Sequence, residues 1–182
     1  MIFLSLLSIL VSLFQIVGFI IHILCIVAFF IMTGGVLYFA WRQFISTFKG
    51  LDDETCGFFG MFTSGLLVYW SPGLFVSGGL LYLSASITAG GLFGMYVTQI
   101  IIATLIIICL AAIALAGVFS ILRTGCRMVA AFFGIFSGDG CGGFFANLGT
   151  FLLHSIVFLP IAYIIFLLLA WLCPIAYTPI VE

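Results

Sequence analysis

The sequence predicts an all-α, polytopic integral membrane protein with about four to six transmembrane helices. Of its 182 residues, 66% are hydrophobic and 5% are charged, whereas about 25% are charged in an ordinary soluble domain. Uncharged runs cover residues 1–41, 55–122 and 140–181, and each exceeds the roughly 20 apolar residues that cross a bilayer as a helix. None shows the strict alternation of a transmembrane barrel, so helices must satisfy the backbone. We expect residues 1–182 to form a single multi-pass transmembrane domain.

The four basic residues occur in two pairs, Arg42 with Lys49 and Arg123 with Arg127. The positive-inside rule places both pairs on the same side of the membrane, so an even number of crossings must separate them. The formal net charge is only −1, and no basic patch suits nucleic acid. The expected partners are therefore the lipid bilayer and other membrane subunits, or further copies of this chain.

Two crossings fit between these basic pairs. The first is expected over residues 57–83 with a kink at Ser71-Pro72-Gly73, and the second over residues 92–122, joined by a turn at 84–91. A further span is expected at 144–172, bent or broken at Pro160.

The N-terminal run of residues 1–41 is about twice the length of one crossing. Its strongest loop signal is the short stretch from Gln15 to Gly18. Either two spans turn tightly there, or one helix lies partly along the membrane interface.

Amphipathic connectors are predicted after the first span and after the span that ends at residue 122. Residues 42–56 and 123–143 are each expected as an interfacial segment closed by a Cys-Gly turn. In the first, Trp41, Phe44 and Phe48 share one helical face. Arg123 and Arg127, one turn apart, are interpreted as interface markers that extend toward water.

The two Cys-Gly turns contain Cys56 and Cys141, the candidate reactive or paired thiols. A disulfide between them requires Cα atoms within about 7 Å. The second turn, GDGCGG, is alternatively a cation-binding loop, but Asp139 is its only carboxylate and calcium takes six or more oxygen ligands. We interpret it as a solvated turn that returns the chain to the membrane.

The similarity of these stretches suggests a duplicated helix-connector-helix unit, with residues 20–85 and 102–172 as the two copies. Parallel repeats of this kind occur in transporters. The alternative is chance, because the chain contains 22 phenylalanines and 21 glycines.

His22 and His154 are the only histidines, and both lie in apolar segments, where an unpartnered polar group is costly. Two such histidines could ligate one haem between helices. A neutral histidine bonded to a serine, a threonine or a carbonyl across helices needs no cofactor, and we favour that interpretation. No catalytic or metal-ligand constellation appears, so we expect no enzyme activity and no cofactor.

The leading functional hypothesis is a non-enzymatic subunit of a larger membrane assembly, with Arg42, Arg123, Arg127, Asp139, His22 and His154 as candidate interface or pathway residues. One alternative is a small channel or transporter built from the duplicated two-span unit. Another is a membrane-shaping protein whose long apolar segments form hairpins that do not fully cross the bilayer.

Overall fold

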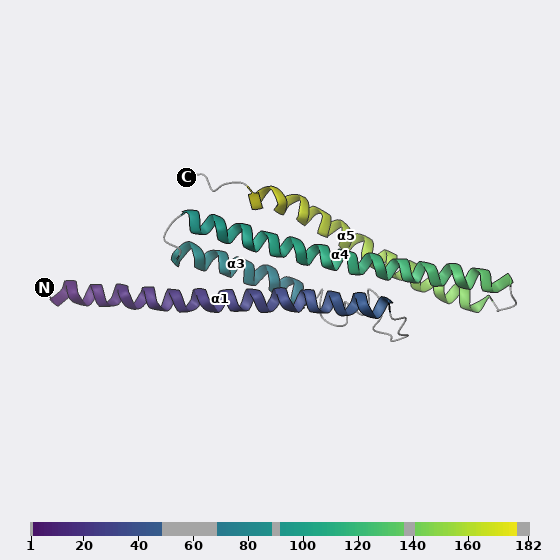
Figure 1. Cartoon of the computed structure of the whole chain (residues 1–182), viewed down its shortest axis with the longest axis horizontal. Helices are drawn as coiled ribbons and strands as arrows, with labels where there is room; N and C mark the ends of the chain where they lie inside the picture. The colour runs from purple at the N-terminus through teal and green to yellow at the C-terminus, as the bar shows by residue number, and fades with distance from the viewer. Residues whose placement is uncertain (1, 49–68, 89–91, 137–140, 178–182) are drawn as a thin grey trace.

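The computed structural model describes residues 2–48, 69–88, 92–136 and 141–177, and within these ranges the chain is helical apart from one turn residue at Cys141. Helices α1 and α4 run in one direction, and α3 and α5 run in the other (Figure 1). The bounds are Ile2–Phe48 for α1 (47 residues), Ser71–Thr88 for α3 (18 residues), Leu92–Phe136 for α4 (45 residues) and Gly142–Tyr177 for α5 (36 residues).

The prediction of an all-helical fold is confirmed for the described residues. Three of the helices contain stretches long and apolar enough to cross a membrane: Leu7–Ile45, Met95–Phe136 and Gly142–Pro174. The shorter helix α3 is not among them. The described residues form four helices. Only three of these have the length and composition of a transmembrane helix, fewer than the four to six that the sequence predicts.

The N-terminal run forms one uninterrupted helix. The structure has no turn between Gln15 and Gly18, because α1 continues from Ile2 to Phe48. At about 1.5 Å per residue this helix is about 70 Å long. The proposal of two spans within residues 1–41 is therefore wrong, and the alternative of a single helix is the one observed.

The amphipathic connectors are not separate helices. Residues 42–48 are the last turns of α1, and α4 continues through Arg123 and Arg127 to Phe136. The sequence pattern correctly indicated helix in both places but not its continuity with the preceding apolar helix. The reason is that nothing near Arg42 or Arg123 breaks a helix, since both positions lack proline.

The prolines of this chain do not interrupt the described helices. Pro72 lies in the first turn of α3, where its missing N–H has no helical partner in any case. The predicted turn at 84–91 begins too early, because α3 extends to Thr88. Helix α5 runs through Pro160 without a break, so a break there is wrong, whereas a bend at Pro160 stays a prediction.

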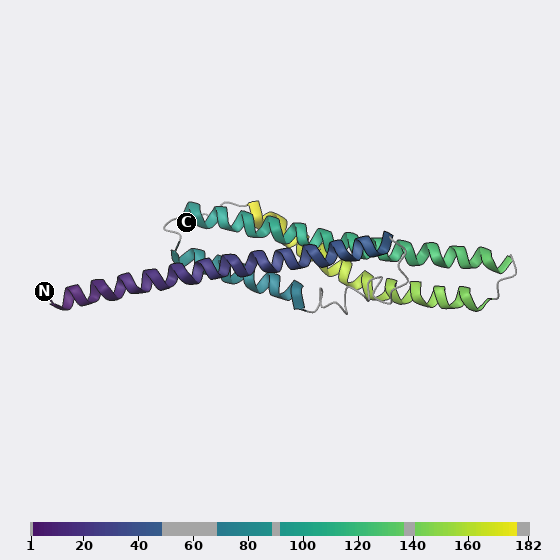
Figure 2. The same ribbon diagram turned by 60° about the horizontal axis from the view of Figure 1, so that its bottom comes forward.

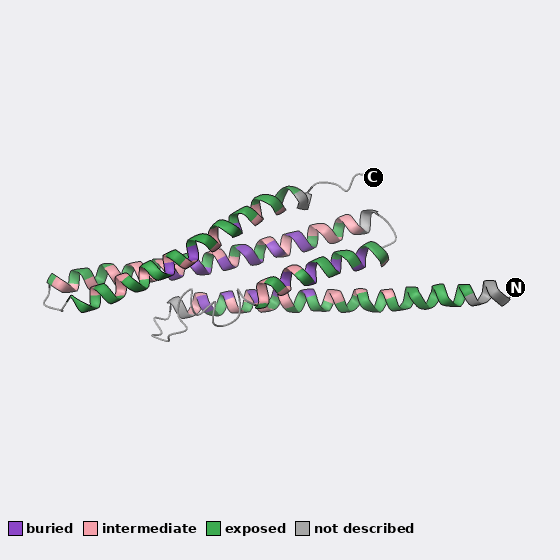
Figure 3. Cartoon of the chain, turned by 180° about the vertical axis from the view of Figure 1, so that it is seen from behind, coloured by how far each residue is buried: buried purple, intermediate pink, exposed green. Residues whose placement is uncertain are grey.

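The buried core lies where α1, α3 and α4 meet and along the contact of α4 with α5. Helix α4 is central: it packs against all three other helices, whereas α1 and α5 do not touch each other within the described ranges. Figure 3 shows the buried positions concentrated on α4, α3 and the C-terminal half of α1. The largest fully buried side chains are Phe29, Leu74, Ile113, Val36 and Cys109.

The helices are strongly staggered. At one end of the core, an added Cβ at Gly18 would lie 3.6 Å from Thr88 Cγ2. At the other end, the rings of Phe44 and Phe119 are 4.9 Å apart. The 26-residue separation of Gly18 and Phe44 on α1 corresponds to a core about 40 Å long.

Apolar helix extends beyond the core at both ends (Figures 1 and 2). We call residues 7–17 of α1 the N-terminal overhang; every one of them is exposed. At the opposite end, α4 and α5 continue together past the end of α1. We call residues 124–136 and 141–153 the aromatic hairpin.

Candidate functional site

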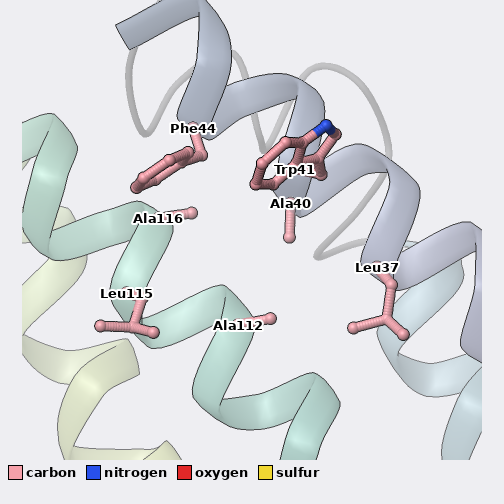
Figure 4. Close-up of a pocket in the computed structure, with 7 residues that line it drawn as sticks. All are labelled: Leu37, Ala40, Trp41, Phe44, Ala112, Leu115 and Ala116. Carbon is pink, nitrogen blue, oxygen red and sulfur yellow. The ribbon is translucent and has the colours of Figure 1, made fainter. Parts of the chain in front are cut away.

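An apolar groove lies between α1 and α4, near the end of the core that is marked by the Phe44–Phe119 contact (Figure 4). Its volume is about 400 Å³. Ala40 and Ala116 are buried, whereas Trp41 is 60% exposed and Leu115 is 57% exposed, so the groove has a buried floor and an open rim. Its lining residues are Leu37, Ala40, Trp41 and Phe44 of α1 and Ala112, Leu115 and Ala116 of α4.

The groove results from small residues placed beside large ones. Positions three and four apart share a helical face, so Ala112 and Ala116 of α4 face the corresponding side of α1. Alanine leaves the space between the helices unfilled. The edge-to-face contact of Phe44 with Phe119, at 84°, lies at the end of this space. Trp41 stacks on Phe44 with ring centroids 5.7 Å apart and forms part of the rim.

Two of the predicted arginines lie above the α4 side of this groove. Arg123 follows Ala112, Ala116 and Phe119 at intervals of four, three and four residues, so all four occupy one face of α4. Arg127 is one further turn along. Arg123 is half-buried and Arg127 is exposed.

The third described arginine, Arg42, lies at the same end of the molecule but on a different face. It is exposed on α1, and its neighbours at helical spacing are Tyr38 and Ile45 rather than Ala40 and Phe44. The structure therefore brings Arg42, Arg123 and Arg127 to one end of the core, and the groove face contains only Arg123 and Arg127.

His154 also lies near this end, on α5. Phe158 of α5 packs at Gly117 and Phe151 packs at Gly125, which places His154 between those levels of α4. The imidazole is buried, and its Nδ1 donates to the carbonyl oxygen of Thr150 at 2.7 Å. The bond within α5 satisfies one ring nitrogen without a cofactor.

His22 is part of a separate polar contact toward the other end of the core. Its Nδ1 lies 2.9 Å from Ser84 Oγ. The Ser84 hydroxyl donates to the carbonyl of Leu81 at 2.9 Å, so the histidine must donate its Nδ1–H to the serine oxygen. The contact joins α1 to α3, as the sequence interpretation of a histidine bonded across helices expects. A cavity of about 160 Å³ adjoins it, lined by His22, Ile26, Phe29, Phe30, Leu81, Thr98, Ile101 and Ile102.

The two histidines do not face each other. His22 contacts Ser84 of α3, whereas His154 lies between the Gly117 and Gly125 levels of α4, toward the opposite end of the core. Within those ranges, no group of three or more histidine, cysteine, aspartate or glutamate side chains is placed to hold a metal ion. The expected absence of a cofactor stays a prediction.

Most buried hydroxyl groups are satisfied by their own helix. Thr33 donates to the carbonyl of Phe29 at 2.8 Å, and Ser77 donates to that of Leu74 at 3.1 Å. A hydroxyl bonded in this way requires neither water nor ligand. The core interior is therefore a packing interface rather than a chain of open polar groups.

The candidate thiols are only partly described. Cys141 is exposed, and its carbonyl accepts the N–H of Phe145 at 3.3 Å, at the start of α5. Cys56 and Asp139 fall outside the described residues, so their predicted roles stay predictions. Cys109 is buried between helices, with its Sγ 4.0 Å from the carbonyl oxygen of Thr33.

The groove was not predicted from the sequence. Its signal is the spacing of Ala112 and Ala116 on one face of a long helix, followed by Arg123 on that same face. That pattern has meaning only once the packing of α1 is known, because a large α1 side chain pointing directly at the two alanines would fill the space.

Fold and site together define an all-helical protein with three helices of membrane-spanning length and composition, and with an apolar groove beside two arginines. Neither a protein-family model, nor a curated protein, nor a solved structure matches this chain. Its function is therefore argued from its own residues.

Proposed function

We propose that this protein is a multi-pass integral membrane subunit, without enzyme activity, that contributes helix packing and structural support to a larger membrane assembly. The observation that supports this most directly is the difference in length between the buried core and the helices α1 and α4. The core is about 40 Å long, similar to the roughly 40–45 Å of a bilayer with its headgroup regions. Helices α1 and α4 are close to 70 Å long and extend beyond it with apolar residues.

The N-terminal overhang is the first exposed apolar surface that a partner would bury. Large apolar side chains there include Phe14, 70% exposed, and Ile9, 66% exposed. Burying eight such side chains stabilises on the order of 10 kcal/mol. When the core occupies the bilayer, these residues lie beyond the hydrocarbon on the side away from the arginines. We propose that a neighbouring subunit buries the apolar side chains of the N-terminal overhang.

The aromatic hairpin is the second such surface. The rings of Phe132 and Phe144 contact each other between α4 and α5 at 5.7 Å. Around them, Phe133 is 65% exposed, Phe136 is 78% exposed and Phe145 is 65% exposed. Exposed phenylalanines gathered at one tip are typical of a surface that docks onto another protein.

The interior favours a packing role over a channel. A water or ion pathway needs polar groups that face an open space. Here Thr33 and Ser77 bond to their own helices, and the larger cavity is lined by carbon apart from the Trp41 indole nitrogen. Small residues at the contacts, such as Gly35, Gly78 and Gly117, allow the close helix approach that replaces hydrophobic drive in lipid.

Site-specific photo-crosslinking in the native membrane tests this proposal. A photoreactive phenylalanine analogue replaces Phe14 in the N-terminal overhang or Phe136 in the aromatic hairpin. The matched control is Ile31, which is 58% exposed at core level on α1 and should face lipid. We expect crosslinks to another chain from both overhang positions and lipid adducts from the control.

Two results would contradict the assembly role. One is the absence of protein crosslinks from both overhangs. The other is a stable single copy of the chain after extraction in mild detergent, measured by light scattering on a size-exclusion column. If alkaline carbonate releases the chain from membranes, then integration itself is disproved.

A further inference from the structure

We infer that the N-terminal overhang binds one apolar helix of a partner subunit along the face of α1 that contains Ser8, Ser12 and Gln15, and that this helix presents amide or hydroxyl side chains at the contact. We call these three residues the polar face of the overhang. The inference rests on the proposed function, in which a neighbouring subunit buries the overhang. It adds the face of α1 that is used and the chemistry of the partner.

The buried side chains of α1, among those the structure describes, all lie on one face of the helix. They follow each other at alternating intervals of four and three residues, a spacing that keeps residues on one side of a helix. A Cβ added at Gly78 of α3 would lie 3.3 Å from Phe29 Cε2, and the Thr33 carbonyl lies 4.0 Å from Cys109 Sγ of α4. We call this face, through which α1 contacts α3 and α4, the packing face of α1. Its residues are Phe29, Thr33, Val36, Ala40 and Gln43.

The polar face of the overhang continues the packing face toward the N-terminus. The alternation of four and three residues extends through half-buried Ile26 and His22 to Gln15, Ser12 and Ser8. Gln15 lies seven residues before His22, and Ser8 lies seven residues before Gln15. A straight helix drifts by only about 20° in seven residues. Both side chains therefore stay close to the side of α1 on which His22 contacts α3.

The overhang is apolar except along this face. All of residues 7–17 are exposed, and the only polar side chains among them are those of Ser8, Ser12 and Gln15. A polar side chain in apolar surroundings is costly unless it forms a hydrogen bond. In membrane proteins, serine and glutamine form such bonds across helix contacts. The position of the three polar side chains therefore indicates the side on which a partner helix lies.

Hydrogen bonding at the polar face requires a partner that both donates and accepts. The Ser12 hydroxyl donates to the carbonyl oxygen of Ser8 at 2.9 Å, so the hydroxyl oxygen is left as an acceptor. The Gln15 amide provides two N–H donors and an acceptor oxygen. Amide and hydroxyl side chains match both requirements, and apolar side chains match neither. The two serines are also small enough to let the helices approach closely.

The space beside the polar face begins where α3 ends. A Cβ added at Gly18 would lie 3.6 Å from Thr88, the last residue of α3, and beyond this level no described helix accompanies α1 (Figures 1 and 2). A second copy of this chain in the same orientation does not fit. Two α1 helices joined at this face would bring the α3 and α4 helices of both copies into the same space. A helix of a different chain that ends near the level of Gly18 fits.

Photo-crosslinking of the purified full chain to a defined helical peptide tests the inference. The probe is a peptide of about 20 leucines with one central glutamine, and the same peptide with leucine at that position is its control. A photoreactive phenylalanine analogue replaces Ser8 on the polar face or Leu10 on the opposite face, and both positions are exposed. Chain and peptide are mixed in detergent micelles so that the peptide reaches the overhang.

We expect the Ser8 position to crosslink the glutamine peptide about 3- to 20-fold more than the Leu10 position, which is the effect of one interhelical hydrogen bond. The leucine peptide should show no such difference. Gln15→Leu should abolish the preference for the glutamine peptide, although this change makes the overhang more apolar. Val17→Leu, on the opposite face, is the matched control and should leave the preference unchanged. All four positions are exposed, so the packing of the core is not altered.

The inference is overturned if the two positions crosslink the glutamine peptide equally, if the two peptides crosslink equally at the Ser8 position, or if Gln15→Leu retains the preference. A lack of crosslinks from the Ser8 position overturns it as well. When any of these results accompanies protein crosslinks from Phe14 in the native membrane, this inference alone is disproved. Absence of protein crosslinks from both Phe14 and Phe136 disproves the proposed function itself.

Discussion

The ring of Phe158 on α5 lies directly over Gly117 of α4, where a side-chain Cβ would overlap it. Phe158 is only 5% exposed, so its ring is enclosed by this contact. Helix α5 has neighbours only on the α4 side within the described ranges. The absence of a side chain at Gly117 therefore sets how closely α5 approaches the rest of the protein.

Gly117→Ala should separate α4 from α5. A methyl group at this position forces the Phe158 ring out of its packed position, and such overpacking costs about 1–3 kcal/mol. We expect a lower melting temperature in detergent, measured by circular dichroism. Gly149→Ala is the control, since nothing lies within 4 Å of the Cβ it adds. Identical melting temperatures for the two variants would show that the contact is not as close as described.

A neighbouring pair of glycines on α1 offers an internally controlled test of the α1–α3 contact. A Cβ at Gly35 would overlap the Trp70 ring, whereas nothing lies within 4 Å of one at Gly34. Alanine also has a better helix propensity than glycine by about 1 kcal/mol. We therefore expect Gly34→Ala to be neutral or stabilising and Gly35→Ala to lower the melting temperature. The opposite order would contradict the packing of Trp70 on α1.

The all-helical class of the fold followed from composition, because hydrocarbon leaves the backbone few alternatives. The positions at which the helices begin and end did not follow from composition. Pro160 and the Gln15–Gly18 stretch are breaking signals in soluble proteins, yet α1 and α5 continue through them. A single glycine weakens a helix by only about 1 kcal/mol, and the packing of α5 against α4 outweighs the backbone hydrogen bond that is lost at Pro160.

For the polar residues too, the sequence indicated the kind of contact but not the partner. The sequence indicated a histidine bonded across helices, but the partner Ser84 is 62 positions from His22 and depends on how α1 packs against α3. The groove depends on the register of α1 against α4, which no local pattern specifies. The internal repeat of 20–85 and 102–172 stays a prediction; α1 with α3 and α4 with α5 are both antiparallel pairs.

Ser120→Ala should stabilise the protein. Ser120 is fully buried on α4, and its hydroxyl oxygen has no hydrogen-bond partner among the described residues. A buried polar group without a partner costs about 1–3 kcal/mol, and alanine removes it while leaving little space. We expect a higher melting temperature than that of the wild type. A clear decrease would reveal a hydrogen-bond partner for this hydroxyl in the assembled protein.

The His22–Ser84 contact should make a small but measurable contribution. A double-mutant cycle of His22→Leu and Ser84→Ala isolates it, because each single change removes the Nδ1–Oγ hydrogen bond. Interhelical hydrogen bonds in membrane proteins average about 0.6 kcal/mol and reach about 1.7 kcal/mol, so we expect a coupling energy in that range from reversible unfolding in mixed micelles. A coupling energy of zero would mean that the contact is not formed in the protein in mixed micelles. The pair Ser86→Ala with His22→Leu is the control, because Ser86 is exposed and bonds to Leu83 on its own helix.

The arrangement of the two helix ends predicts which thiols share a side of the membrane. The Phe44–Phe119 contact fixes the C-terminal end of α1 beside the arginine region of α4. The aromatic hairpin, with exposed Cys141, extends from that same end. Cys56 follows the end of α1 by eight positions. We therefore expect Cys56 and Cys141 to lie on one side, opposite the N-terminal overhang.

Single-cysteine variants in sealed vesicles, treated with a membrane-impermeant maleimide, measure this directly. Cys56 and Cys141 should react from one face, and Ser12→Cys in the N-terminal overhang should react from the other. Cys109, with no exposed surface, should react only after unfolding and serves as the control for loss of the fold. Protection of Cys56 and Cys141 in the native membrane, followed by reaction after detergent extraction, would indicate a covering partner. Labelling of Cys56 and Cys141 from opposite faces would contradict both the even number of crossings between the arginines and the placement of the core across the bilayer.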